Sequence, residues 1–245
     1  MSNASVADFG VLAASDLDML LALHDREIDE LRWHQLKAIG FPHNLGLKLE
    51  SEWGVDAKRL LQHALGTWAA EFQGDLLEEL ATDYAAIYLN NSYHAPPYES
   101  VWLDEDGLMM QQPMFDVREW YAQHNLEVSD WRKRTDDHLS NELGFVSYLL
   151  ASPDNRVEEA ARVLDEHLHR CLPEFGGRIA QRADTPFYAG LAALTMAYVD
   201  ELRDVLSDIL GAPRPTREEI EERLKPKPEA KEVPLQYMPG ATPSW

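Results

Sequence analysis

The fold class is decided by residues 186–210, PFYAGLAALTMAYVDELRDVLSDIL. Apolar residues recur there every three or four positions, which is the period of an amphipathic helix and not of a strand. Thr185 and Pro186 form the pattern of a helix cap followed by proline in the first turn. The apolar stripe continues to the end of the segment, with Phe187, Leu191, Leu194, Tyr198, Leu202, Val205 and Ile209. These features predict a long buried helix.

Helical periodicity recurs over most of the chain. We expect helices over 15–39, 56–73 and 75–90, from Pro113 to about His124, and from near Asp136 to Leu150. Ser152-Pro153 has the pattern of a helix start, and Thr216-x-x-Glu219 that of a capping box. The sequence has neither the alternation typical of strands nor an Asn-Gly hairpin signal. We therefore expect an all-α fold.

The chain is long enough for one substantial core. We expect a single helical bundle over residues 15–210, after a flexible N-terminus at 1–14. Residues 211–245 hold seven of the 14 prolines, so a short helix and a disordered proline-rich tail are expected there.

Acidic residues dominate the charge balance, with 43 Asp and Glu against 22 Lys and Arg and a net charge of -21. Such a surface repels nucleic acids and anionic lipids and favours cationic partners, although the same charge also serves solubility alone. No apolar run is long enough to span a membrane, and the N-terminus lacks an export signal. We therefore expect a cytoplasmic protein that neither binds nucleic acid nor inserts into membranes.

Motifs of enzymes and metal sites are scarce. Phosphate-binding loops, dinucleotide-binding loops, nucleophile elbows and His-Glu-x-x-His motifs are absent from the sequence. The single cysteine, Cys171, excludes an internal disulfide and a multi-cysteine metal site. One Glu-x-x-His motif, Glu166 to His169, stands close to Cys171, and a di-iron bundle needs two such motifs. No cofactor is therefore expected, and a helical metal enzyme built on these residues, or on His138 and Glu142, is kept as an alternative.

Two motifs stand out instead. The stretch HAPPYESVW, residues 94–102, places two prolines, two aromatic residues and a carboxylate between helical segments. The stretch DDHLSNEL, residues 136–143, places acidic residues in a first helical turn, where the helix dipole alone accounts for them.

Together these motifs resemble the TorD/DmsD/NarJ family, all-helical cytoplasmic chaperones of molybdenum enzymes. The family pattern is an aromatic-rich helix, a Pro-Pro-aromatic-x-Ser turn and an Asp-His-Leu-x-x-Glu-Leu helix. The turn is matched by Pro96, Pro97, Tyr98 and Ser100, and the helix by Asp137, His138, Leu139, Glu142 and Leu143. The resemblance covers about residues 55–210. Asp136 departs from the proline that many members carry, and Tyr98 replaces a Trp found in some.

The resemblance implies a partner: the apo form of a molybdoenzyme of the dimethyl sulfoxide reductase superfamily, with its twin-arginine signal peptide. Paired arginines require carboxylates, and the apolar stretch after them requires a groove. We expect Glu99, Asp136, Asp137 and Glu142 to supply the charge. The apolar wall would come from Trp68, Tyr84, Tyr88, Tyr98 and Trp102, with Pro97, Ser100 and His138 completing the site.

In this interpretation the prolines fix the loop, which lowers the entropy cost of binding. The alternative is that Tyr98 and Trp102 only fill the core. The protein as a whole is expected to be a monomer, with a homodimer as the alternative. A general adaptor for basic partners remains a competing function.

Overall fold

The computed structural model describes residues 3–67 and 74–225, and all regular structure in these ranges is helical. The expected all-α fold is confirmed. Two of the helical segments, η1 and η2, are π-helices. The elements are α1 Asn3–Asp25, α2 Glu30–Ala38, α3 Glu52–Thr67, α4 Gly74–Tyr84, η1 Ala85–Leu89, α5 Glu99–Leu103, α6 Gln112–Gln123, α7 Leu139–Ala151, α8 Val157–Val163, η2 Leu164–Leu168, α9 His169–Arg182, α10 Pro186–Leu210 and α11 Arg217–Leu224.

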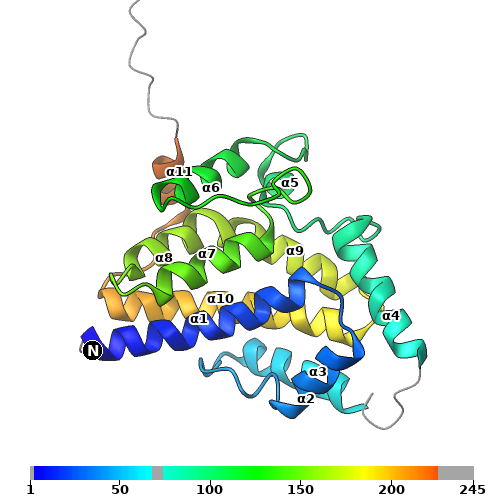
Figure 1. The fold of residues 1–245 in the computed structure, drawn as a ribbon. Helices are drawn as coiled ribbons and strands as arrows, with labels where there is room; N and C mark the ends of the chain where they lie inside the picture. Colours follow the sequence, from blue (N-terminus) through cyan, green and yellow to red (C-terminus); the bar gives the residue numbers. More distant parts are fainter. Residues whose placement is uncertain (1–2, 68–73, 226–245) are drawn as a thin grey trace, which may run out of the picture. The chain divides into compact units, whose positions relative to one another are not determined.

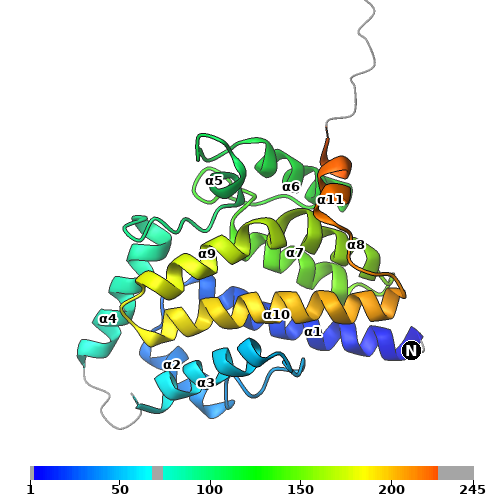
Figure 2. The ribbon, with the colours of Figure 1, turned by 180° about the vertical axis from the view of Figure 1, so that it is seen from behind.

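The central helix of the bundle is α10, and both views show it running beside α1 (Figures 1 and 2). It packs against α3 on one side and α9 on another, while α7 lies along α1. The predicted stripe is confirmed, because its first five residues are fully buried and the last two pack against the core. Helix α10 begins at Pro186 after the cap residue Thr185, as predicted.

The N-terminal expectations were wrong in two respects. Residues 3–14 are helical and belong to α1, whose Val6, Ala13 and Ala14 are buried. Sequence periodicity is weak there because small residues make the contact: a Cβ on Gly10 would lie 2.4 Å from the Leu150 carbonyl oxygen. The expected helix 15–39 is also two helices, because Asp29 caps a new start by accepting a hydrogen bond from the Arg32 amide.

The other expected helix starts were partly correct. Ser152 ends α7, and α8 begins only at Val157, so Ser152-Pro153 does not start a helix. The capping box at Thr216 and Glu219 is present. The chain divides into two compact units, Met1–Arg214 and Pro215–Trp245, and the expected tail after residue 225 lies outside the described residues. In the part of the chain that the structure describes, no helix is both long and apolar enough to cross a bilayer.

Candidate functional site

The two sequence motifs meet in space. The Glu99 amide donates to the Asp137 carbonyl at 3.0 Å, and the Leu139 amide donates to the Pro97 carbonyl at 2.8 Å. Tyr98 and His138 therefore pair as an isolated antiparallel bridge. We call this connection the clasp: residues 97–100 held against residues 135–139.

Asp137 holds the clasp together from inside. Its side chain is fully buried, and one carboxylate oxygen accepts hydrogen bonds from the Ser100 amide at 2.8 Å and the Ser100 hydroxyl at 2.5 Å. The other oxygen accepts from the Thr135 hydroxyl at 2.6 Å. Three internal donors satisfy this carboxylate, so it is occupied before any ligand arrives.

The two sequence neighbours of Asp137 also form hydrogen bonds within the protein. Asp136 is 3% exposed and accepts two hydrogen bonds from the Arg118 guanidinium, at 2.7 and 3.2 Å. His138 caps α7, its Nδ1 accepting from the Ser140 amide at 3.1 Å. Burial lowers the pKa of His138 well below its usual value, so the ring is neutral and can act as an acceptor.

Beneath the clasp lies a buried pair of carboxyls. Glu99 on α5 and Glu142 on α7 are each 1% exposed. Burial, as the main cause, raises the pKa of both groups well above the usual value. Neither carboxyl oxygen of Glu142 has a hydrogen-bond partner among the described residues, and the neighbouring charges of Glu99 and Asp137 add to the rise in its pKa. A protonated carboxyl carries no charge, so the raised pKa values lower the cost of burying the pair.

His167 on η2 completes this buried cluster. Its Nδ1 lies 2.9 Å from a Glu99 carboxyl oxygen, and burial lowers the pKa of His167 to about 4. Arg170, one turn further on, comes within 3.8 Å of the other Glu99 oxygen. The sequence placed His167 in a candidate metal motif, and the structure makes it the neutral neighbour of Glu99 instead.

Little space remains inside the cluster. The cavity bounded by the clasp, α7 and α9 measures about 10 Å³, the room of about one water molecule. Glu99, Asp136, Asp137 and Glu142, which were expected to supply charge to the signal peptide, are all buried in this structure, and their role in binding stays a prediction. The sequence brings these carboxylates together but does not reveal that they point inward.

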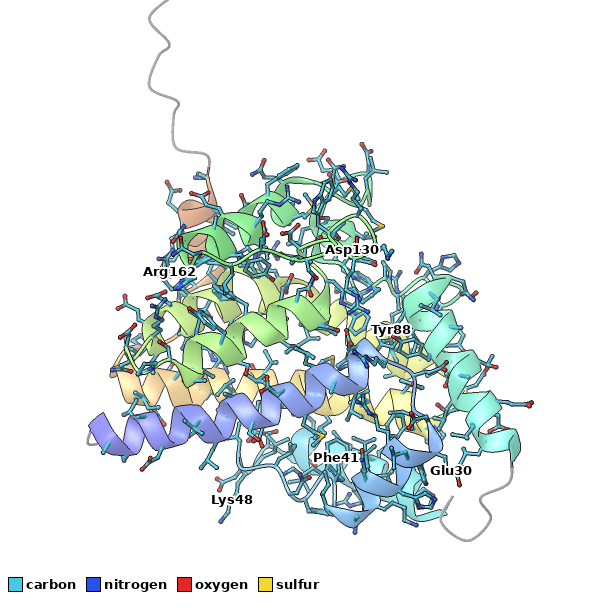
Figure 3. The ribbon with its side chains drawn as sticks, in the orientation of Figure 1. Glu30, Phe41, Lys48, Tyr88, Asp130 and Arg162 are labelled. Atoms are coloured by element: carbon cyan, nitrogen blue, oxygen red, sulfur yellow. The ribbon has the colours of Figure 1, made fainter. Side chains whose placement is uncertain are left out.

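Tyr84 and Tyr88, both expected in the wall of the groove, lie in a different polar cluster. Their ring centroids lie 4.7 Å apart with the planes tilted by 34°, and the Tyr84 hydroxyl donates to the Asp25 carbonyl at 2.7 Å. Tyr88 on η1 lies 2.6 Å from His24 Nδ1, beside the C-terminal end of α1 in Figure 3. The second His24 nitrogen meets the Thr195 hydroxyl at 2.8 Å. Sequence reasoning missed this cluster, because a single histidine in a helix gives no signal of its partners.

The clasp leaves two aromatic side chains at the surface. Tyr98 and Trp102 are half-buried, whereas Pro97 and Ser100 are buried. The Trp102 indole donates to the Pro96 carbonyl at 2.8 Å, and the Arg178 guanidinium stacks 4.8 Å from its ring. Trp68 lies outside the described residues. Among the described residues expected in the wall, Tyr98 and Trp102 are therefore the two that lie beside the clasp.

The alternative metal site is not assembled in the described part of the chain, where no three His, Cys, Asp or Glu side chains are grouped to hold an ion. Glu166 accepts a hydrogen bond from Arg162 at 3.0 Å, and Nδ1 of His167 is hydrogen-bonded to Glu99. Cys171 is buried, and burial raises its pKa well above the usual value.

Comparisons with known proteins identify the family to which the two motifs of the clasp belong. A family model described as nitrate reductase delta subunit matches residues 48–178, which include both halves of the clasp. The chain is 27% identical over 195 residues to the chaperone protein TorD of Vibrio cholerae strain O395, covering 75% of this chain and 86% of that one. It is 32% identical over 143 residues to TorD of Psychrobacter sp. strain PRwf-1, covering 55% and 65%. The chain therefore belongs to the nitrate reductase delta subunit family, which confirms its resemblance to the TorD/DmsD/NarJ proteins.

Proposed function

We propose that this protein is a cytoplasmic chaperone for a molybdopterin oxidoreductase of the dimethyl sulfoxide reductase superfamily. In this proposal it binds the twin-arginine signal peptide and the apo enzyme reversibly, and it assists cofactor insertion before export. It acts as a monomer, with a homodimer as the alternative, and needs no cofactor or nucleic acid of its own. Curated relatives named chaperone protein TorD support the general role.

The observation that carries the proposal is the clasp. It lies inside the region that the family model matches, and it joins the two motifs that carry the resemblance. A loop fixed by Asp137 presents Tyr98 and Trp102 without losing further backbone entropy when a partner binds. In our proposal the site residues act in two layers: the buried carboxylates hold the loop, and the half-buried aromatic residues contact the peptide.

The charge of the molecule supports a cationic partner. A net charge of -21 attracts a peptide that carries paired arginines and speeds its encounter with the protein. This attraction does not by itself select paired arginines over any other basic segment, so the general adaptor must be excluded by experiment.

Calorimetric titration with a panel of molybdoenzyme signal peptides tests the proposal. Each peptide is paired with a version whose two arginines are replaced by glutamine while the apolar stretch is kept. We expect dissociation constants of about 1 μM or lower for at least one arginine peptide, and a loss of about tenfold or more with its glutamine pair. Equal binding of both versions would remove the twin-arginine role. Equal binding of an unrelated basic peptide would favour the adaptor.

A further inference from the structure

A second surface lies next to the clasp and is open to solvent. Leu108, Met109 and Met110 lie in the loop between α5 and α6, Phe115 lies in the first turn of α6, and Trp131 precedes the second motif. Their exposed fractions range from 41% to 52%. We call these five residues the outer apolar patch. Grouped exposed apolar side chains of this size commonly mark binding surfaces.

The loop that carries the patch is fixed in shape. One Asp104 carboxylate oxygen accepts from the Asp106 amide at 3.1 Å and from the Leu108 amide at 3.0 Å. The Gln111 side chain donates to the Met109 carbonyl at 3.0 Å. Met110 has a left-handed backbone with φ of 60°, which is uncommon for a bulky residue. A strained backbone that displays methionines to solvent is typical of a ligand-binding loop.

The aromatic half of the patch is anchored to the second motif. The Arg118 guanidinium lies 5.6 Å from the Phe115 ring and 5.2 Å from the Trp131 ring, while it pairs with buried Asp136. Asp130, the residue before Trp131, lies in the part of the molecule that α5 and α6 occupy (Figure 3). Asp136 thus fixes the arginine that separates the two exposed rings. This gives the second motif a role at the surface, although its own carboxylates are buried.

Charge near the patch identifies the chemistry of the occupant. Glu105 and Asp106 are exposed directly before the apolar residues of the loop. In the basic run on the other side, Lys133 pairs with Asp130 and Arg134 with Asp25, while Arg132 lies over the Trp131 ring at 5.6 Å. A segment that carries cationic residues followed by an apolar stretch complements this arrangement. Methionine side chains adapt to apolar partners of varied sequence.

We propose that the outer apolar patch docks the apolar stretch of the twin-arginine signal peptide, with its arginines directed toward Glu105 and Asp106. This inference rests on the proposed function and deepens it, because it adds to Tyr98 and Trp102 a surface that binds the apolar stretch and the arginines of the peptide. It also provides accessible carboxylates for the arginines, which the buried cluster of Glu99 and Glu142 does not.

The test titrates the tightest peptide of the panel into the wild type and two double variants. Met109→Ser with Phe115→Ser removes apolar surface from the patch. Leu31→Ser with Leu89→Ser removes exposed apolar surface elsewhere and serves as the matched control, since both leucines are more than 60% exposed. We expect the patch variant to bind about tenfold or more weakly and the control to bind like the wild type. The melting temperatures of the three proteins should be similar, because all four side chains are exposed.

A third variant tests the arginine side of the surface. Glu105→Gln with Asp106→Asn should weaken binding of the arginine peptide and leave binding of the glutamine peptide unchanged. Wild-type affinity in both the patch variant and this charge variant would overturn the inference while leaving the proposed function standing. Loss of a homodimer in the patch variant, with peptide affinity unchanged, would assign the patch to a second copy and overturn the inference. Failure of the wild type itself to bind any peptide would overturn both.

Discussion

At the residue scale, Asp137 is a structural carboxylate. Asp137→Ala leaves the Ser100 amide, the Ser100 hydroxyl and the Thr135 hydroxyl without their acceptor. Because hydrogen bonds to a charged group each contribute about 1.5–3 kcal/mol, we expect the free energy of unfolding to fall by about 3 kcal/mol or more. Urea denaturation measures this change. The control is Asp130→Ala, which removes only an exposed ion pair and should cost less than about 1 kcal/mol. An Asp137→Ala protein of native stability and weakened peptide affinity would contradict this role.

His24 is expected to make stability depend on pH. Burial lowers its pKa from 6.5 to about 3, so in that interval the unfolded chain binds a proton that the folded chain does not. Its contribution is therefore present above pH 6.5 and is lost as the pH falls toward 3. Unfolding free energies of the wild type and His24→Gln should converge as the pH falls, by up to about 1.4 kcal/mol per pH unit. Parallel curves would show that folding does not lower the pKa of His24.

The Glu99 and Glu142 pair is expected to make stability depend on pH in the opposite direction to His24. The pKa of each carboxyl is raised in the folded state. The contribution of the pair to the free energy of unfolding is therefore fully present below about pH 4.5 and is lost as the pH rises through the raised pKa values. Glu142→Gln keeps a neutral side chain of the same size, so the variant should gain stability relative to the wild type as the pH rises from 5 to 8. Denaturation across that range is the measurement. A constant difference at every pH would mean that folding does not raise the pKa of Glu142.

At the scale of elements, the packing of α1 on α7 depends on Gly10. A Cβ at this position would meet the backbone of Leu150 at 2.4 Å, and backbone cannot move aside cheaply. Gly10→Ala should therefore destabilise the protein by about 1–3 kcal/mol, as overpacking does. Gly177 on α9 has no atom within 4 Å of its Cβ position, so Gly177→Ala is the matched control and should be neutral or stabilising through helix propensity. Equal effects in thermal denaturation would show that α1 does not pack this closely.

Helices α1, α7 and α10 show which parts of the fold and of the candidate site the sequence predicts. Helix α10 was predicted because large apolar residues mark its buried stripe, whereas residues 3–14 of α1 were missed because glycine and alanine make their contact. The meeting of the two motifs was anticipated only through the family resemblance. The inward direction of Asp137 and Glu142 was not anticipated, because buried carboxyls are rare unless internal donors or a raised pKa compensate them. The donors to Asp137 lie on α5 and in the loop before α7. Helical periodicity does not predict which elements come into contact.

At the scale of the whole molecule, the net charge of -21 predicts salt-sensitive binding. Raising the ionic strength from about 0.1 M to about 1 M shortens the Debye length from about 10 Å to about 3 Å. Long-range attraction of the arginine peptide should then be lost, and its association rate should fall more than that of the glutamine peptide. Stopped-flow measurement at several salt concentrations checks this expectation. Equal salt dependence for the two peptides would mean that the acidic surface does not steer the arginines.

The central claim is that this protein prepares a molybdoenzyme for its cofactor. Its most direct test is the molybdenum content of a partner oxidoreductase purified from cells that express it with or without this chain. We predict more molybdenum per enzyme when the chain is present, and a smaller gain with the Met109→Ser and Phe115→Ser variant. The same molybdenum content in both cells, for every enzyme of the superfamily tried, would contradict the maturation role.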